Sequence, residues 1–186
     1  MALESPKYTI ISTEKKFEIR EYQGYVVAEA QVDGDYNSAL NNGFRILADY
    51  IFGNNTKKAH IAMTAPVTQA YADKSEKIEM TVPVLASSSG PSKYRISFMM
   101  PAKYSIDTLP QPNNKEIAFN KVDGYRAAVI RFSGILDKKL ALKKQGELES
   151  WLKANRLVPK SDYIYAQYNP PWIPGPFRRN EILAEV

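Results

Sequence analysis

The residues best suited to bind a ligand lie near the C-terminus, around a loop that proline keeps out of regular structure. Residues 169–176 read Asn-Pro-Pro-Trp-Ile-Pro-Gly-Pro, and this proline content excludes a helix or the interior of a sheet. Trp172 lies on this stiff loop, and Arg178 and Arg179 stand just beyond it. A rigid aromatic ring beside guanidinium groups suits a flat ligand that carries carboxylates. Pairing of both arginines with neighbouring carboxylates is the competing interpretation.

Five other residues outside this loop have side chains that can contact a ligand. Arg45 can add positive charge, and Glu181, which enters the last predicted strand, can be an inward carboxylate that recognises a cation. His60 can ligate iron through a neutral imidazole, although its charged surroundings also fit an exposed loop. Met63 can line a soft pocket, and so can Met80, but core packing explains their alternation equally well.

The reactive residue types and motifs in the rest of the sequence argue against catalysis. The chain has one histidine and no cysteine, which leaves little for a nucleophile–base triad or a multi-histidine metal site. Neither an HExxH motif nor a glycine-rich phosphate loop occurs in the sequence. We therefore expect a binding protein and not an enzyme.

Bulk properties narrow the class of protein further. The 186 residues fit one domain, and the net charge of +5 is spread over short basic runs without a stripe of exposed aromatics, so we expect no nucleic-acid partner. No apolar run approaches the roughly 20 residues that cross a bilayer, and we expect no membrane partner. The absence of cysteine and of an apolar leader at Met1–Lys7 predicts a cytoplasmic protein.

A repeat at an offset of 100 residues predicts the architecture. Gly24 and Tyr25 recur as Gly124 and Tyr125, and Gly34 recurs as Gly134. Strand-like runs and a helical stripe follow at matching places in both copies, so each half reads as strand, turn, strand, glycine and helix. Asp35 and Asp137 are the expected helix caps, and the halves span about 8–105 and 113–186, joined by a proline-containing connector.

The middle of the chain holds a shorter repeat. Ile-Ala-Met-Thr-Ala-Pro-Val at 61–67 returns as Ile-Glu-Met-Thr-Val-Pro-Val at 78–84, and both segments alternate like strands. A proline inside each predicts an edge strand or a bulge. Further strands are expected at 94–100, 163–168 and 181–186. The whole predicts an α+β fold, a distorted antiparallel β-barrel flanked by two helices, with a groove where the halves meet.

These motifs resemble the SOUL haem-binding protein family, in its bacterial and plant-like branch. The resemblance covers the chain from about Tyr8 to Val186 and rests on the doubled I-x-M-T-x-P-V segment and five further motifs. Those five are Phe-Glu-Ile-Arg-Glu-Tyr at 17–22, Phe-Met-Met-Pro at 98–101, Ala-Val-Ile-Arg-Phe-Ser-Gly at 128–134, Tyr-Asn-Pro-Pro-Trp at 168–172 and Phe-Arg-Arg-Asn-Glu at 177–181.

The resemblance implies a pseudo-twofold barrel that binds haem or a related porphyrin. It implies a shallow cleft between the first helix and the loop before the last strand. The expected binding residues are Leu40, Phe44, Arg45, Met63, Met80, Trp172, Arg178 and Arg179.

This sequence departs from the family pattern at several positions. Glu21 stands where some vertebrate members have a histidine. Asn41, Asp49 and Ile173 stand where others have basic residues. We therefore expect mainly hydrophobic contact with the porphyrin.

Two alternatives stay open beside a porphyrin carrier or buffer. The two-half architecture also resembles GyrI-like effector-binding domains, some of which are hydrolytic, and Glu181 would then hold a cationic compound. In the third interpretation, the Pro-Pro-Trp loop docks on an unknown partner protein and no small ligand is bound.

Overall fold

A computed structural model describes residues 4–71 and 92–186 of the chain. Within these ranges the elements follow the order β1 (Tyr8–Glu14), β2 (Phe17–Tyr22), β3 (Tyr25–Gly34), α1 (Tyr36–Ile51), β4 (Val67–Tyr71), β5 (Ser92–Met99), β6 (Ile117–Val122), β7 (Tyr125–Phe132), α2 (Lys138–Ala154), β8 (Ile164–Gln167), the 3-10 helix η1 (Gly175–Phe177) and β9 (Asn180–Glu185). The fold is α+β, as the sequence predicts.

All these strands pair antiparallel in one sheet of order β1-β2-β7-β9-β8-β4-β5-β3-β6. Without β1, this order is symmetric about its middle. Strand β2 corresponds to β6, β7 to β3, β9 to β5 and β8 to β4. The pseudo-twofold axis therefore passes between β8 and β4. Each half lends one strand to the other half, because β2 pairs with β7 and β6 pairs with β3.

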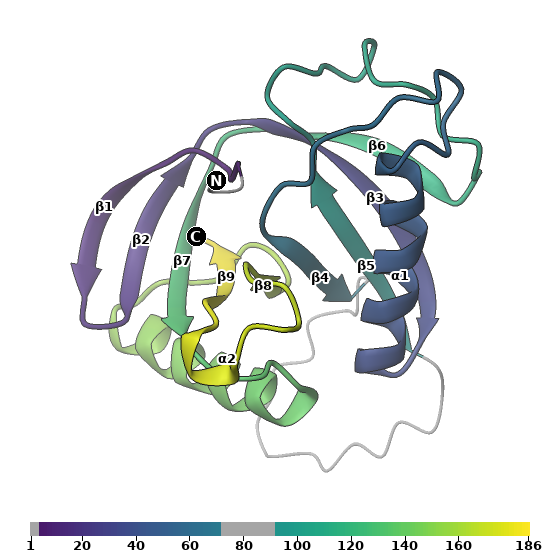
Figure 1. Cartoon of the computed structure of the whole chain (residues 1–186). Helices are drawn as coiled ribbons and strands as arrows, with labels where there is room; N and C mark the ends of the chain where they lie inside the picture. The colour runs from purple at the N-terminus through teal and green to yellow at the C-terminus, as the bar shows by residue number, and fades with distance from the viewer. Residues whose placement is uncertain (1–3, 72–91) are drawn as a thin grey trace.

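The two helices begin at the predicted caps. The side chain of Asp35 accepts hydrogen bonds from the backbone N–H groups of Asn37 and Ser38, both at 3.0 Å, and Asp137 accepts one from Leu140 at 2.7 Å. These bonds satisfy N–H groups that the first helical turn leaves without partners. Helix α1 packs on β3 and β5, and α2 packs on β7 and β9. Figure 1 shows the curved sheet with a helix against each half.

The predicted distorted antiparallel barrel is confirmed, and it is not closed, because β1 and β6 are separate edges among the described strands. One expectation about the strands needs correction. The strand predicted over 61–67 is wrong, since β4 begins only at Val67. In the segment before it, the N–H groups of Ile61 and Ala65 bond to carbonyls of Ile51 and Glu4 and not to a neighbouring strand.

The expectation that the proline-containing strand at 61–67 is an edge strand or carries a bulge is also wrong. Strand β4 lies inside the sheet between β8 and β5, and Pro66 precedes it. The second copy of the repeat, at 78–84, lies outside the described residues, and so does Met80. Neither described helix is long and apolar enough to span a membrane.

The contact between α1 and β5 depends on a glycine. A Cβ atom at Gly43 would lie 2.3 Å from Cγ1 and 2.6 Å from Cβ of Ile96, so α1 can approach the sheet this closely only without a side chain there. Gly146 of α2 is the contrasting case, because a Cβ atom there would have no neighbour within 4 Å. Gly43 is therefore needed for packing, while Gly146 only weakens its helix.

We expect Gly43→Ala to lower the free energy of unfolding by about 1–3 kcal/mol, as overpacking does. Gly146→Ala should raise it by about 0.5–1 kcal/mol, because alanine loses less backbone entropy in a helix. Urea unfolding followed by circular dichroism measures both changes. Equal effects of the two substitutions would contradict the packing role of Gly43.

Candidate functional site

The two halves of the sheet meet where the repeated Gly-Tyr turns cross. A Cβ atom at Gly24 would lie 3.0 Å from the carbonyl oxygen of Val122, and one at Gly124 would lie 3.1 Å from that of Tyr22. Both distances are tighter than a side chain normally tolerates. The glycines therefore allow the two turns to pass backbone against backbone.

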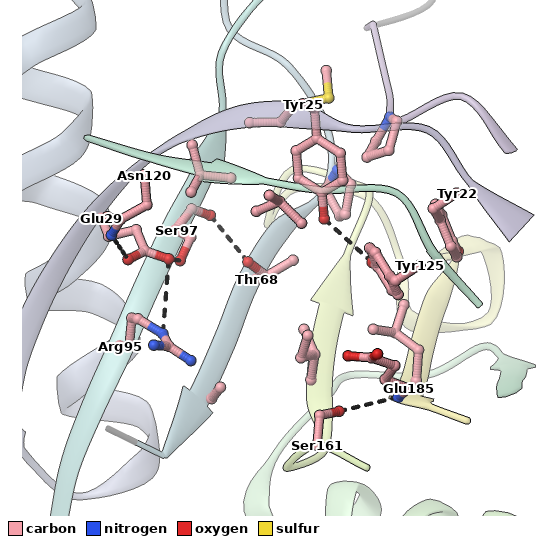
Figure 2. Close-up of a pocket in the computed structure, with 18 of the residues that line it drawn as sticks. Tyr22, Tyr25, Glu29, Thr68, Arg95, Ser97, Asn120, Tyr125, Ser161 and Glu185 are labelled. Carbon is pink, nitrogen blue, oxygen red and sulfur yellow. Dashed lines mark hydrogen bonds and ion pairs between the residues drawn. The ribbon is translucent and has the colours of Figure 1, made fainter. Parts of the chain in front are cut away.

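The tyrosines that follow these glycines face each other across the pseudo-twofold axis. The hydroxyl oxygens of Tyr25 and Tyr125 lie 3.3 Å apart, and Figure 2 shows both rings at one end of a cavity. Burial raises the pKa of both phenols, because the anionic form loses its hydration. Both side chains are therefore neutral hydrogen-bonding groups at neutral pH.

Below this pair, the concave face of the sheet encloses a pocket of about 510 Å³. Its wall comes from alternate residues of the central strands, such as Val27 and Glu29 of β3, Thr68 of β4 and Ser97 of β5. The residues between them, Ala28 and Ile96 for example, belong to the core on the helix side. The pocket thus lies on the face of the sheet that the helices leave free, in the seam that the sequence predicts.

One side of this seam pocket is polar and charged. Glu29 accepts hydrogen bonds from Asn120 at 2.5 Å and from the Ser97 hydroxyl at 3.1 Å, and its carboxylate lies 3.8 Å from Nε of Arg95 (Figure 2). Lys121, whose side chain is largely exposed, also lines this side. Arg95 thus faces Glu29, and Lys121 lies 3.4 Å from the carboxylate of Asp123.

The opposite side, built from the second half of the chain, is mainly aromatic and apolar. Ile164 of β8, Leu183 of β9 and the rings of Tyr125 and Tyr168 line it. Glu185 and Ser161 add polar atoms at its margin, where the backbone N–H of Glu185 donates to the Ser161 hydroxyl at 3.0 Å. The seam pocket thus combines a charged side with a mainly apolar side.

A buried ion pair adjoins the apolar side through Tyr168. The guanidinium of Arg20 binds both carboxylate oxygens of Glu181, at 2.8 and 2.9 Å, and the two side chains are 1% and 0% exposed. Arg179 binds the same carboxylate at 2.8 Å, and the hydroxyl of Tyr168 donates to it at 2.7 Å. Because Tyr168 also lines the pocket, this network fixes one of its walls.

Glu181 is consequently not an open carboxylate for a cationic ligand, which corrects the sequence-based expectation. It is not among the residues that line the pocket, and its oxygens are occupied by Arg20, Arg179 and Tyr168. Burial alone would oppose its ionisation, but the hydrogen bonds and charge of Arg20, with the charge of Arg179, outweigh burial and lower its pKa. Its role in this structure is to hold the fold together.

The two arginines of the tail do not form the expected clamp. Arg178 donates to the carbonyl oxygens of Ile173, at 2.6 Å, and Pro171, so it holds the proline loop in shape. Arg179 pairs with Glu181 and stacks 4.1 Å over the ring of Tyr168. Trp172 stays 78% exposed. The competing interpretation, in which both arginines pair with neighbouring carboxylates, agrees with the contacts of Arg179, whereas Arg178 bonds to backbone carbonyls instead.

The first-helix candidates lie elsewhere. Leu40 and Phe44 are partly buried against the core, and the ring of Phe44 packs on Phe98 at 5.3 Å. Arg45 is exposed on the same helix. Helix α1 packs on β3 and β5, and the tail loop bonds to Gly134 ahead of α2, so the expected grouping of these residues with Trp172 stays a prediction.

The two other described candidates are also outside the seam pocket. His60 is exposed and lines a separate hollow with Phe52 and Asn113, and Met63 packs partly buried against the core. Among the described residues, no group of three or more histidine or acidic side chains could hold a metal ion. The roles assigned to these residues in porphyrin binding stay predictions.

Sequence reasoning missed the residues that line the seam pocket, Tyr25 and Tyr125 above all. The repeat itself contained the signal, because residues that repeat about a twofold axis and lie near it must meet. Glu29 and Arg95 gave no such signal, since only strand pairing brings β3 and β5 together.

Comparison with known proteins identifies the family. The profile of the SOUL heme-binding proteins matches residues 3–75 and 68–185. The chain belongs to the SOUL heme-binding protein family. Among SOUL relatives, "Heme-binding protein 1" of Xenopus laevis is 26% identical over 168 residues, which cover 89% of this chain and 81% of the relative. Human "Heme-binding protein 2" is 28% identical over 160 residues, covering 83% and 71%.

Solved structures share the fold at low sequence identity. The C-terminal domain of EcmrR superposes with a TM-score of 0.67 at 14% identity, covering 96% of both chains. A structure described as a hydrolase from Listeria innocua gives a TM-score of 0.59 at 9% identity, covering 94% of this chain and 93% of the other. At such low identities, the likeness establishes only the architecture of this SOUL protein and not its function.

The buried ion pair generates a stability prediction. Glu181→Gln leaves the Arg20 guanidinium buried without its counter-charge, so the free energy of unfolding should fall by about 3–5 kcal/mol. The lowered pKa makes this contribution present above pH 4.5, the ordinary value, and it is lost as pH falls through the depressed pKa. The difference in the free energy of unfolding between wild type and Glu181→Gln should therefore become smaller in acid, as measured by urea unfolding.

A neighbouring surface pair is the matched control. Glu21 lies 3.4 Å from Arg126 with both side chains more than half exposed, so Glu21→Gln should cost less than about 1 kcal/mol. Equal losses in the two variants, or a gap that grows in acid, would contradict the role of the buried pair.

Proposed function

We propose that this protein binds haem or a related tetrapyrrole in the seam pocket and serves as a carrier or buffer. Two findings support the proposal. The chain belongs to a heme-binding family over nearly its full length, and its relatives are named for heme binding. The pocket, at about 510 Å³, falls within the 300–1,000 Å³ that small-molecule sites usually enclose.

The two-sided lining of the pocket is the observation that carries the proposal. A porphyrin is a flat apolar ring with its two carboxylates on one edge, so it needs an apolar wall and cations along one margin. Leu183 and Ile164 supply the apolar wall. Arg95 and Lys121 supply cations on the opposite side, and both remain exposed enough to meet carboxylates at the rim.

Residues of the chain fit each part of the ligand. The aromatic rings of Tyr25, Tyr125 and Tyr168 offer flat surface for stacking, and the apolar side chains exclude water. Bound haem would supply its iron for redox or ligand chemistry, and the protein would supply a defined place and orientation. Because the seam is hollow, a role as a protein-interaction module without a small ligand loses its main support.

Filling the pocket provides the test of the site. Ala70 is a small residue of β4 that lines the cavity, so Ala70→Trp should occupy space that the porphyrin needs. We expect hemin affinity to fall about tenfold or more, equivalent to about 1.4 kcal/mol of binding free energy. Titration of hemin into purified protein, followed by the Soret band, measures the affinity.

Companion variants separate the site from the fold and from the first helix. Circular dichroism must show that Ala70→Trp keeps its secondary structure, and Thr68→Phe provides a second way of filling the pocket. Arg45→Ala tests the exposed face of α1. Loss of affinity in Arg45→Ala with none in either filled variant would place the ligand on α1 and overturn the seam site. Absence of any saturable Soret change in wild type would overturn haem binding itself.

A lipophilic aromatic cation is a second candidate ligand, and Glu29 is the observation that favours it. This carboxylate lines the pocket together with tyrosine rings, and a carboxylate near aromatic faces attracts organic cations. This is the role that the sequence assigned to Glu181, transferred to a residue of β3 that faces the cavity. Hydrolysis of such a compound is not proposed.

The two candidates predict opposite effects of one substitution. Glu29→Gln removes a negative charge, so it should weaken binding of ethidium, a planar cation, by about tenfold. The same change should leave hemin binding unchanged or strengthen it, because the propionates lose a like charge. Fluorescence titration with ethidium and Soret titration with hemin measure both. A loss of hemin affinity in Glu29→Gln contradicts the porphyrin arrangement.

A further inference from the structure

The paired tyrosines at the crossing of the two halves form a site that the family relationship does not assign. Their hydroxyl oxygens lie 3.3 Å apart, and both side chains line the seam pocket. The only hydrogen bond that the structure describes for either hydroxyl is the one they share. Each oxygen therefore keeps a lone pair for a ligand in the cavity.

The backbone holds this pair in place. Tyr25 and Tyr125 open β3 and β7, and each follows a glycine that packs against the opposite turn. The ring of Tyr125 stacks on Tyr22 at 5.0 Å and 13°, and Tyr22 in turn accepts a hydrogen bond from the buried Arg20 at 2.9 Å. The pair is therefore preorganised and does not need to move when a ligand arrives.

We propose that Tyr25 is the axial ligand to the iron of ferric haem in the seam pocket and that Tyr125 donates a hydrogen bond to its bound oxygen. This inference rests on the proposed function of the pocket. A phenolate is an established haem ligand, and ferric iron favours oxygen donors. Tyr25 also lies on the same strand as Glu29, so it belongs to the polar half of the pocket.

Charge balance favours this ligation. Ferric haem carries one net positive charge at its core, and a phenolate neutralises it, so no uncompensated core charge is buried. The Tyr25 hydroxyl loses its proton and its oxygen forms the bond to iron. The proton combines with the hydroxide that hemin carries in neutral water and leaves as one water molecule. No oxidant or reductant is consumed.

Spectroscopy of three variants tests the assignment. Wild-type protein with hemin should give the absorption and resonance Raman signature of ferric iron bound to a phenolate. Tyr25→Phe should lose this signature and bind hemin about 10- to 100-fold more weakly, the range seen when support of a metal is removed. Tyr125→Phe should keep the signature at a shifted iron–oxygen frequency, because only the donated hydrogen bond is lost. His60→Ala should match wild type.

Metal-free protoporphyrin IX separates this inference from the proposed function. Because it has no iron, its affinity should be the same for wild type, Tyr25→Phe and Tyr125→Phe, and this equality also shows that the variants fold. Porphyrin binding without a phenolate signature in the wild type, or with one that survives in Tyr25→Phe, overturns the tyrosine ligand alone. Loss of the iron signature in His60→Ala would do the same. Failure of both hemin and protoporphyrin IX to bind wild type overturns the proposed function.

Discussion

The seam pocket depends on the close approach of two turns that only glycine permits. Gly24 and Gly124 each pass within about van der Waals contact of a carbonyl oxygen from the opposite turn, and this contact lets each half lend one strand to the other. Once the strands are exchanged, the sheet must curve around the axis between β8 and β4. The curvature leaves a hollow on the side away from the helices. The following tyrosines then meet across it as a geometric consequence, so one backbone constraint produces both the cavity and its most distinctive polar pair.

A second constraint secures the wall of this hollow. Arg20 comes from the exchanged strand β2 and Glu181 from β9, so their buried pair ties the lent strand to the half that receives it. A buried ion pair adds little net stability compared with an apolar contact, but it is costly to break and it specifies which strands are neighbours. Tyr168 and Arg179 complete the network and connect it to the pocket. Glu181 and Arg179 therefore fix the strand neighbours and the position of Tyr168. Contact with a ligand is left to the residues that line the pocket.

Local rules made part of this fold predictable, and long-range pairing made the rest unpredictable. The caps at Asp35 and Asp137 follow from side-chain chemistry within four residues, so sequence suffices for them. The alternation at 61–67 misleads, because an extended segment that bonds to Ile51 and Glu4 alternates like a strand without belonging to a sheet. The site was harder still. Its lining comes from strands of both halves that share no local pattern, and the arginines singled out near the tail are satisfied by partners that only the folded chain brings close.

The asymmetry of the pocket is the strongest reason to connect it with an asymmetric ligand. At an offset of 100 residues Tyr25 corresponds to Tyr125, but Glu29 corresponds to the fully buried Val129, which packs beneath the apolar side in a cluster with Leu183. A symmetric cavity would suit a symmetric ligand or none. Here the paired hydroxyls stay on the axis, Glu29, Arg95 and Lys121 lie on one flank, and the other flank is mainly apolar with Glu185 at its margin. A porphyrin has the same organisation, with a reactive centre in the middle, carboxylates on one edge and hydrocarbon on the other, so each region of the pocket meets a ligand region of matching polarity.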